Sequence, residues 1–385
     1  MRRITLLISS LVGGGAERLN CALAAGLDSR GHLVSVVTLS GYSRPAVPLP
    51  GEVRVYPLDV MGESGGPAAA VLGNWRRTRA VRETVAETAP DVLISSLTET
   101  NVLAAVATRL PARAPWRLVI WEHEYPPMAE IKPLWRVGRR VTFRWADAAV
   151  AASKGAADSL RTLLHCRNVA CIHDPVLLHE RGPDAEAALA ARALEGTRWV
   201  LGMGRLAPVK GFDLLIDAFA RIPPDSRAGW KLGIIGEGPL RDELERLIEA
   251  RGLTGDARLL GSFRNPAAVL RAGAVFALTS RHEGFGMALA EAMACGLAAV
   301  SFRCPCGPEE IVRHGTDGLL VPPEDVDAFA GALEELMQDE VLRERLGGRA
   351  TEAARRFSKA AFLDRWEKLI EELARAGAPA PGGAG

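Results

Sequence analysis

Short apolar runs alternate with segments of helix-forming composition along the chain, and this alternation restricts the fold more than any other feature. Residues 274–279 (AVFALT) are almost wholly apolar, residues 287–294 have helical composition and end before Cys295-Gly296, and residues 297–301 (LAAVS) are apolar again. Strands that are buried on both faces have such runs, and glycine commonly ends a helix. The stretch therefore predicts a strand, a helix and a parallel strand, which is the unit of a doubly wound α/β sheet.

The same alternation occurs in both halves of the chain. In the first half it predicts a helix over 16–30 and strands over 3–10, 33–40, 91–96, 118–121 and 148–152. In the second half it predicts strands over 199–203, 231–235, 257–260, 274–279, 297–301 and 318–321, and helices over 212–221, 239–251, 287–294, 325–337, 340–356 and 360–376. We expect two Rossmann-like α/β domains, residues 1–176 and 177–358, with a cleft between them, then a helix (359–376) and a disordered tail (377–385).

Length and charge exclude several classes of protein. The 385 residues exceed one ordinary domain, and a formal net charge of +1 argues against nucleic acid as a principal partner. No apolar run approaches the ~20 residues that span a bilayer. The basic start and apolar run of residues 1–12 lack a cleavage site and predict a first strand rather than a signal peptide. We therefore expect a cytoplasmic protein.

The cysteines and histidines do not form a metal-binding pattern. Cys304-Pro-Cys306 is a single CxC pair without a second pair at zinc spacing, and the seven histidines form neither HxH nor HExxH. Reduced thiols without a metal are the expectation for all six cysteines.

In each half of the chain, the first predicted strand is followed by a glycine-containing turn. Gly13-Gly14-Gly15 leads into a helix, so its backbone N–H groups can approach an anion or a sugar; a tight turn explains it equally well. In the second half, Gly204 is followed by Arg205 and, five residues later, by Lys210. Two cations at the carboxyl edge of a parallel sheet can clamp a pyrophosphate, although solvated surface cations are an equal alternative in isolation.

A second loop of the same domain favours the phosphate interpretation. Glu283-Gly284-Phe285-Gly286 follows the strand at 274–279, and Gly284 to Met287 are expected to begin a helix whose N–H groups attract phosphate oxygens. Glu291, about one turn into that helix, can accept hydrogen bonds from ribose hydroxyls. The combination predicts a site for a nucleoside diphosphate that carries a sugar. By position alone, Glu237 and Phe263 are further candidate contacts for its base and ribose.

Together these motifs resemble the signature of the retaining glycosyltransferases of family 4, which have the GT-B fold. The resemblance rests on Glu283-x7-Glu291, on Gly204-Arg205-x4-Lys210-Gly211 and on the glycine loop at 13–15, and it covers nearly the whole chain. Cys304-Pro-Cys306-Gly-Pro-Glu-Glu310 is also similar to a motif of bacterial polysaccharide and lipid-linked oligosaccharide transferases, with Glu310 at the position of its glutamate.

The resemblance implies a role for each candidate residue. Arg205 and Lys210 would hold the diphosphate of the donor, a UDP-sugar by expectation, without a metal. Glu283 would contact the transferred sugar and Glu291 the ribose, while Gly14 and Gly15 would line the cleft. His123 follows a strand at the place where such enzymes often keep a histidine near the reacting sugar; a purely structural histidine is the alternative. The fold also implies that the final helix returns to the first domain.

The acceptor and three rival functions remain open at this level. Arginines next to tryptophans, at 75–82 and 135–145, suit docking on an anionic membrane that carries a polyprenyl-linked acceptor, and solvated arginines are an equal alternative. With a soluble acceptor, the product would instead be a glycosylated small molecule. A UDP-sugar 2-epimerase would share the fold but requires other acid and base groups. A non-catalytic partner subunit would be expected to have lost Arg205, Lys210 or Glu283, and all three are present.

Overall fold

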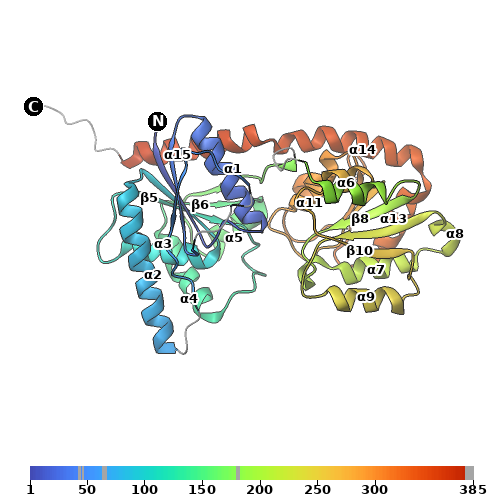
Figure 1. Cartoon of the computed structure of the whole chain (residues 1–385), viewed down its shortest axis with the longest axis horizontal. Coiled ribbons are helices and arrows are strands. Elements are labelled where there is room, and N and C mark those ends of the chain that lie inside the picture. Colours follow the sequence, from blue (N-terminus) through green and yellow to red (C-terminus); the bar gives the residue numbers. More distant parts are fainter. Residues whose placement is uncertain (42–44, 46, 63–66, 179–182, 378–385) are drawn as a thin grey trace, which may run out of the picture. The chain divides into compact units, whose positions relative to one another are not determined.

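The computed structural model of the chain describes residues 1–41, 45, 47–62, 67–178 and 183–377 (Figure 1). The predicted tail (377–385) lies outside the described residues except for Gly377, which ends a helix. The chain divides into two compact units: an N-terminal unit of Met1–His173 with Ala360–Gly385, and a C-terminal unit of Asp174–Lys359. Each unit contains a parallel sheet flanked by helices, which confirms the prediction of two Rossmann-like α/β domains.

The N-terminal unit forms a parallel sheet in the order β3-β2-β1-β4-β5-β6-β7. Its strands are β1 (Arg3–Ile8), β2 (Leu33–Thr38), β3 (Arg54–Pro57), β4 (Val92–Ser96), β5 (Arg117–Glu122), β6 (Ala148–Ala151) and β7 (Val169–Cys171). Its helices are α1 (Gly15–Ser29), α2 (Pro67–Thr88), α3 (Thr98–Arg109), α4 (Pro133–Thr142), α5 (Lys154–Thr162) and α15 (Lys359–Gly377).

The C-terminal unit forms a second parallel sheet in the order β10-β9-β8-β11-β12-β13. Its strands are β8 (Arg198–Met203), β9 (Trp230–Ile235), β10 (Ala257–Gly261), β11 (Val275–Leu278), β12 (Ala298–Phe302) and β13 (Leu319–Val321). Its α-helices are α6 (Ala185–Arg192), α7 (Phe212–Arg221), α8 (Pro224–Arg227), α9 (Arg241–Ala250), α10 (Ala267–Arg271), α11 (Met287–Ala294), α12 (Pro308–Ile311), α13 (Val326–Gln338) and α14 (Glu340–Ala354).

In each sheet the strand order reverses next to the first strand of the unit. β1 lies between β2 and β4, and β8 lies between β9 and β11, with every pairing parallel. The loops that leave the carboxyl ends of two such strands diverge, and ligands of open α/β sheets bind between them. In the C-terminal unit these are the loops after β8 and β11, which carry Arg205, Lys210 and Glu283.

Sequence patterns located the buried strands and missed two at the sheet edges. β4 and β11 are buried along their whole length, as their apolar composition predicts. The edge strands β3 (RVYP) and β7 (VAC) contain no fully buried residue, and they escaped prediction. A strand at the edge of a sheet is covered by fewer neighbours than a central strand. Its residues can therefore be more polar, and its sequence need not contain an apolar run.

The final helix, α15, packs on the N-terminal unit although it follows the C-terminal unit in sequence. Trp366 of α15 is fully buried, and its ring stands edge-on to Trp121 of β5 at a centroid distance of 4.8 Å. Glu367 accepts a hydrogen bond from Arg30 at 2.7 Å, and Glu371 pairs with Arg2 at 3.0 Å. Both apolar packing and ion pairs therefore attach α15 to this unit.

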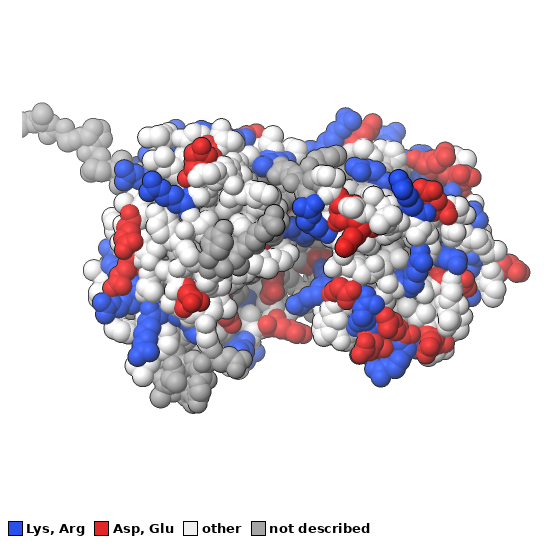
Figure 2. Space-filling view, viewed as in Figure 1, with Lys and Arg blue, Asp and Glu red and all other residues white. Residues whose placement is uncertain are grey.

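The molecular surface carries charges of both signs. Figure 2 shows lysine and arginine side chains interspersed with aspartate and glutamate over the face in view, and over the whole chain the two signs nearly balance, at a net charge of +1. Among the described residues, every helix is too short or too polar to cross a bilayer.

Candidate functional site

The loops after β8 and β11 are joined by an ion pair between two of the predicted site residues. Lys210 Nζ lies 2.6 Å from Glu283 Oε1, although 73 residues separate them in sequence. Ser280 Oγ donates a second hydrogen bond to the same oxygen at 2.7 Å. Glu283 is only 8% exposed, so its charge depends on these partners rather than on water.

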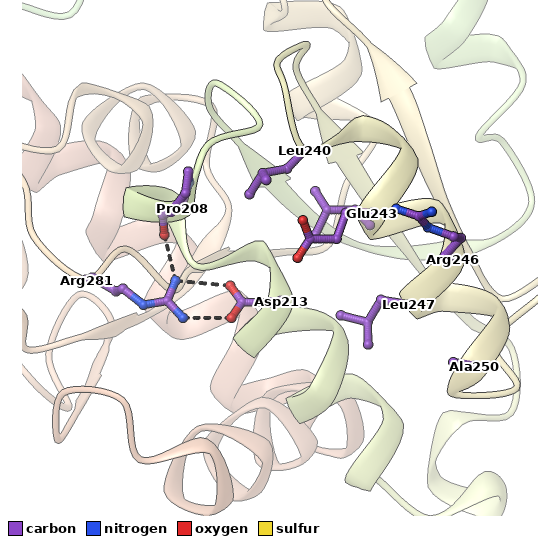
Figure 3. A pocket seen from close by; sticks show the side chains of 9 residues that line it. Pro208, Asp213, Leu240, Glu243, Arg246, Leu247, Ala250 and Arg281 are labelled. Atoms are coloured by element: carbon purple, nitrogen blue, oxygen red, sulfur yellow. Dashed lines mark hydrogen bonds and ion pairs between the residues drawn. The ribbon is translucent and has the colours of Figure 1, made fainter.

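Arg281 holds the backbones of the two loops in register (Figure 3). Its guanidinium donates to the Pro208 carbonyl at 2.6 Å and forms a two-pronged pair with Asp213 at 2.6 and 3.1 Å. Its backbone N–H donates to the Val209 carbonyl at 2.8 Å. Pro208 and Arg281 also line a groove of about 470 Å³ beside α9. The guanidinium of Arg281 therefore fixes the approach of Lys210 to Glu283.

Gly211, which follows Lys210, occupies a position where no residue with a side chain fits. Its φ of 60° is left-handed, and a Cβ atom would lie 2.1 Å from the Thr279 carbonyl oxygen. The turn after Lys210 can therefore pass directly against the end of β11.

Arg205 and Lys210 differ in their surroundings. The methylene stem of Lys210 lies beside Gly204, where a Cβ would meet it at 3.3 Å. Arg205 is exposed, and none of the described residues forms an ion pair with its guanidinium. Lys210 is thus pre-positioned by protein contacts, whereas Arg205 is available to an anionic ligand from solvent.

The helix after Glu283 has the bounds that its composition predicted, 287–294, but it does not include Gly284 and Phe285, which were expected at its start. α11 begins at Met287, with Gly286 as its N-cap at a φ of 105°, so Gly284 and Phe285 precede the helix. Phe285 is buried and packs edge-on against Phe357 at a centroid distance of 5.1 Å, which leaves chiefly its backbone for ligand contact. Glu291 is 3% exposed and lies about one turn into α11, as expected.

The candidate base-binding positions lie on the neighbouring strand ends. Glu237 follows β9, and its carbonyl accepts a hydrogen bond from Leu206 N–H at 2.9 Å, which places its loop beside that of Arg205. The Glu237 carboxylate pairs with Arg241 at 2.7 Å, and this hydrogen bond lowers its pKa. Phe263 is half-buried in the loop after β10.

In the N-terminal unit, the glycine loop lies where β1 and β4 diverge. Gly14 is the N-cap of α1 and Gly15 is its first residue. Asn20 of α1 exchanges hydrogen bonds with Ser96 Oγ, at the end of β4, at 2.9 and 3.0 Å. The beginning of α1 is thereby fixed to the carboxyl edge of this sheet.

His123 follows β5 at the same edge of the N-terminal sheet. Its ring is tilted by 40° to the Trp121 ring at a centroid distance of 4.5 Å, and neither ring nitrogen has a hydrogen-bond partner among the described residues. Burial lowers the pKa of His123 to about 3. The imidazole is therefore neutral at physiological pH.

Glu122 is a residue of this region that the sequence patterns did not single out. It is 2% exposed, accepts a hydrogen bond from Thr98 Oγ1 at 2.9 Å and accepts another from the His123 N–H at 3.2 Å. Burial, assisted by Glu124, raises its pKa to about 7 against the opposing influence of Arg139. A glutamate that ends an apolar strand run was the available sequence signal.

Comparison with known proteins identifies both halves of the chain. Residues 14–173 match the model of the glycosyl transferase 4-like domain, and residues 187–353 match that of the glycosyl transferases group 1. Together the two models cover most of the chain. Both matched segments contain candidate site residues, namely Gly14 and His123 in the first and Lys210 and Glu283 in the second.

Two curated relatives show how far the similarity extends. An N-acetyl-D-galactosaminyltransferase of Campylobacter jejuni, which acts on an undecaprenol-diphosphate glycan, is 28% identical over 98% of this chain and 100% of its own length. An exopolysaccharide phosphotransferase of Streptomyces coelicolor is 41% identical over 44% of this chain. This chain spans only 18% of the length of that second protein.

A solved structure shares the fold over nearly the full length. Anabaena HepE in complex with UDP-glucose superposes with a TM-score of 0.76, over 97% of this chain and 100% of its own, at 20% identity. The chain therefore belongs to the glycosyltransferases of GT-B fold, with a glycosyl transferase 4-like domain followed by a group 1 glycosyl transferase domain.

Proposed function

We propose that this chain transfers a sugar from a nucleoside-diphosphate sugar, a UDP-sugar by preference, to an acceptor hydroxyl with retention of anomeric configuration. The observation that carries the proposal is the meeting of Lys210 and Glu283 at the carboxyl ends of β8 and β11. A cation and a buried carboxylate at that edge suit a phosphate group and sugar hydroxyls respectively. The complex of HepE with UDP-glucose supports the choice of donor.

The proposed chemistry needs stabilisation of a leaving diphosphate. The bond from the anomeric carbon to the phosphate oxygen breaks, the acceptor oxygen bonds to that carbon on the same face, and its proton passes to the departing phosphate. Lys210, Arg205 and the amino end of α11 supply positive charge for the phosphate oxygens, so the residues present can do this work without a metal ion. Glu283 holds the sugar hydroxyls and does not attack the carbon. Glu291 holds the ribose.

The acceptor side rests on the N-terminal unit. We assign His123 a place near the transferred sugar, where its neutral ring can exchange hydrogen bonds with a hydroxyl. Gly14 and Gly15, at the carboxyl edge of the same sheet, would offer backbone groups to the substrates. The undecaprenol-diphosphate glycan acceptor of the Campylobacter relative supports a lipid-linked acceptor for this chain too, and with it a role in bacterial cell-surface or lipid-linked glycan synthesis.

The surface of α4 suits contact with the membrane that would carry such an acceptor. Leu134, Val137 and Val141 are 54%, 63% and 40% exposed, and their spacing places them on one side of the helix. Arg136 and Arg140 are exposed on the same helix, which carries no acidic residue. An apolar stripe beside arginines suits the interface of an anionic bilayer.

Several arginines that the sequence grouped with this surface are engaged elsewhere. Arg139 of α4 is buried and donates to the Pro126 carbonyl. On α2, Arg77 and Arg82 donate to backbone carbonyls, and Arg79 pairs with Glu83. The proposed membrane contact therefore rests on α4 rather than on α2.

Replacing Val137 with glutamate should reduce co-sedimentation with vesicles of phosphatidylglycerol and phosphatidylcholine at least threefold at low salt. The change places a negative charge in the apolar stripe, where it opposes insertion and repels anionic lipid. Leu189→Glu on α6 is the matched control, because Leu189 is 64% exposed in the C-terminal unit. Equal sedimentation of Val137→Glu and wild type, or no binding by wild type, would count against membrane contact through α4.

Assays of nucleoside-diphosphate release test the transferase proposal as a whole. Purified protein is incubated with UDP- and GDP-sugars, with and without polyprenyl-diphosphate glycans or soluble aglycones. We expect UDP release that requires an acceptor, with a product of retained configuration by NMR. Release with isomerised free sugar and no acceptor would indicate an epimerase. Turnover with soluble aglycones alone would indicate a small-molecule acceptor, and no turnover at all would favour a non-catalytic subunit.

A further inference from the structure

The Lys210–Glu283 ion pair engages the same ammonium group that the proposed function assigns to the donor diphosphate. We propose that Glu283 competes with the nucleoside diphosphate for Lys210, and that it retakes Lys210 after sugar transfer and thereby accelerates release of the leaving group. This inference rests on the proposed function. It adds to Glu283 a role that contact with the sugar does not require.

The burial of Glu283 is the reason for this competition. Its side chain is 9% exposed, and Oε1 accepts hydrogen bonds both from Lys210 at 2.6 Å and from Ser280 at 2.7 Å. A carboxylate with little access to water needs such partners, because an unpaired buried charge is strongly unfavourable. In the absence of sugar, Lys210 is the cationic partner that the structure shows for it.

A bound sugar changes this balance. When the hydroxyls of the donor sugar donate to Glu283, its carboxylate keeps enough hydrogen bonds for Lys210 to turn to the phosphate. Once the sugar has moved to the acceptor, those hydroxyls leave with it. The carboxylate then draws Lys210 back, and its negative charge repels the diphosphate that remains.

The exchange needs movement of one side chain only. Arg281 holds the loops of both residues through Pro208 and Val209, and Thr279 Oγ1 donates to the Lys210 carbonyl at 3.3 Å. The Lys210 side chain is 23% exposed and lies along Gly204, which has no side chain to obstruct it. Lys210 can therefore turn between Glu283 and a phosphate while the backbone stays fixed, on the short timescale of rotamer changes.

Binding of UDP and GDP to wild type and Glu283→Gln tests the proposal. The glutamine keeps the size of the side chain but loses its charge, so we expect it to bind UDP about tenfold more tightly, with slower dissociation. The affinity of this variant for an intact UDP-sugar should not rise as much as its affinity for UDP, because glutamine binds the sugar hydroxyls more weakly than the carboxylate does. Isothermal titration calorimetry gives the affinities, and stopped-flow displacement gives the dissociation rates.

Three further variants separate competition from general effects. Glu245→Gln removes one negative charge from the same unit, where Glu245 pairs with Arg241, and should leave UDP affinity unchanged. Ser280→Ala removes a hydrogen bond from Glu283 but keeps its charge, and should not tighten UDP binding. Arg205→Ala should weaken UDP binding in both backgrounds. Melting temperatures show whether each variant is folded.

The outcomes of this experiment are distinct. If wild type binds UDP or GDP and Glu283→Gln binds it equally or more weakly, the competition is wrong while the transferase proposal stands. If Glu245→Gln tightens binding as much as Glu283→Gln, the effect is one of overall charge and the proposal is also wrong. If folded wild type binds neither nucleotide, both proposals fail together.

Discussion

Replacing Lys210 with alanine should lower the turnover number for sugar transfer by about three orders of magnitude, with a much smaller effect on KM for the acceptor. The turn at Gly211 fixes the backbone of Lys210 against the end of β11, so its ammonium is within a side-chain rotation of the diphosphate before that group begins to leave. Pre-positioned charge in a sheltered site is typically worth about 10²–10³ in rate per group. Initial rates of UDP release at saturating donor and acceptor measure the effect.

The alanine variant also leaves Glu283 buried without its cation, which can destabilise the unit. Lys210→Ala combined with Glu283→Gln removes both charges and keeps that unit stable for comparison. Arg246→Ala on α9 is the control for loss of a cation from the same unit. A loss of turnover below about tenfold in a folded Lys210→Ala variant would remove Lys210 from the proposed catalytic role.

Replacing Glu122 with glutamine should stabilise the N-terminal unit by about 3 kcal/mol at pH 8.5 and have little effect near pH 4.5. The pKa of Glu122 is raised to about 7, so the folded protein holds its proton more tightly than the unfolded chain does. The contribution of Glu122 to the free energy of unfolding is therefore fully present at a pH below the ordinary pKa of a glutamate, and it is lost as the pH rises through 7. Glutamine mimics the protonated acid and avoids this loss.

The measurement compares urea unfolding of both proteins between pH 4.5 and 8.5. His123, whose pKa is lowered, and Asp174, whose pKa is raised, also make stability depend on pH, but they do so in both proteins and cancel in the difference. Glu99→Gln, an exposed change on α3, is the control. A difference that stays constant over the pH range would show that Glu122 does not titrate near neutrality.

Most helices and strands could be predicted from the sequence because the patterns that specify them lie within a few neighbouring residues. Apolar runs such as 275–278 and the glycine that follows α11 specify a buried strand and a helix end within a few residues. β3 and β7 escaped prediction because edge strands have weaker local patterns. The predicted extent of α11, 287–294, is correct, but the expectation that Gly284 and Phe285 begin the helix was wrong because the left-handed Gly286 is the N-cap, and the sequence does not mark which glycine has that role.

The candidate site could be predicted only as a set of loops. The sequence placed Lys210 and Glu283 at carboxyl edges of one sheet, but their ion pair depends on the order of strands β8 and β11. The bracing by Arg281 and the burial of Glu122 likewise depend on tertiary packing that no local spacing encodes.

The packing of α15 has a consequence for the order in which the chain can fold during its synthesis. The C-terminal unit is one continuous stretch, so all of it has left the ribosome before α15 appears. The N-terminal unit instead lacks the partner of Trp121 and the ion-pair partners of Arg2 and Arg30 until residues 360–377 emerge. The first segment to be translated is therefore the last to be completed, and its exposed apolar surface has to remain soluble until then.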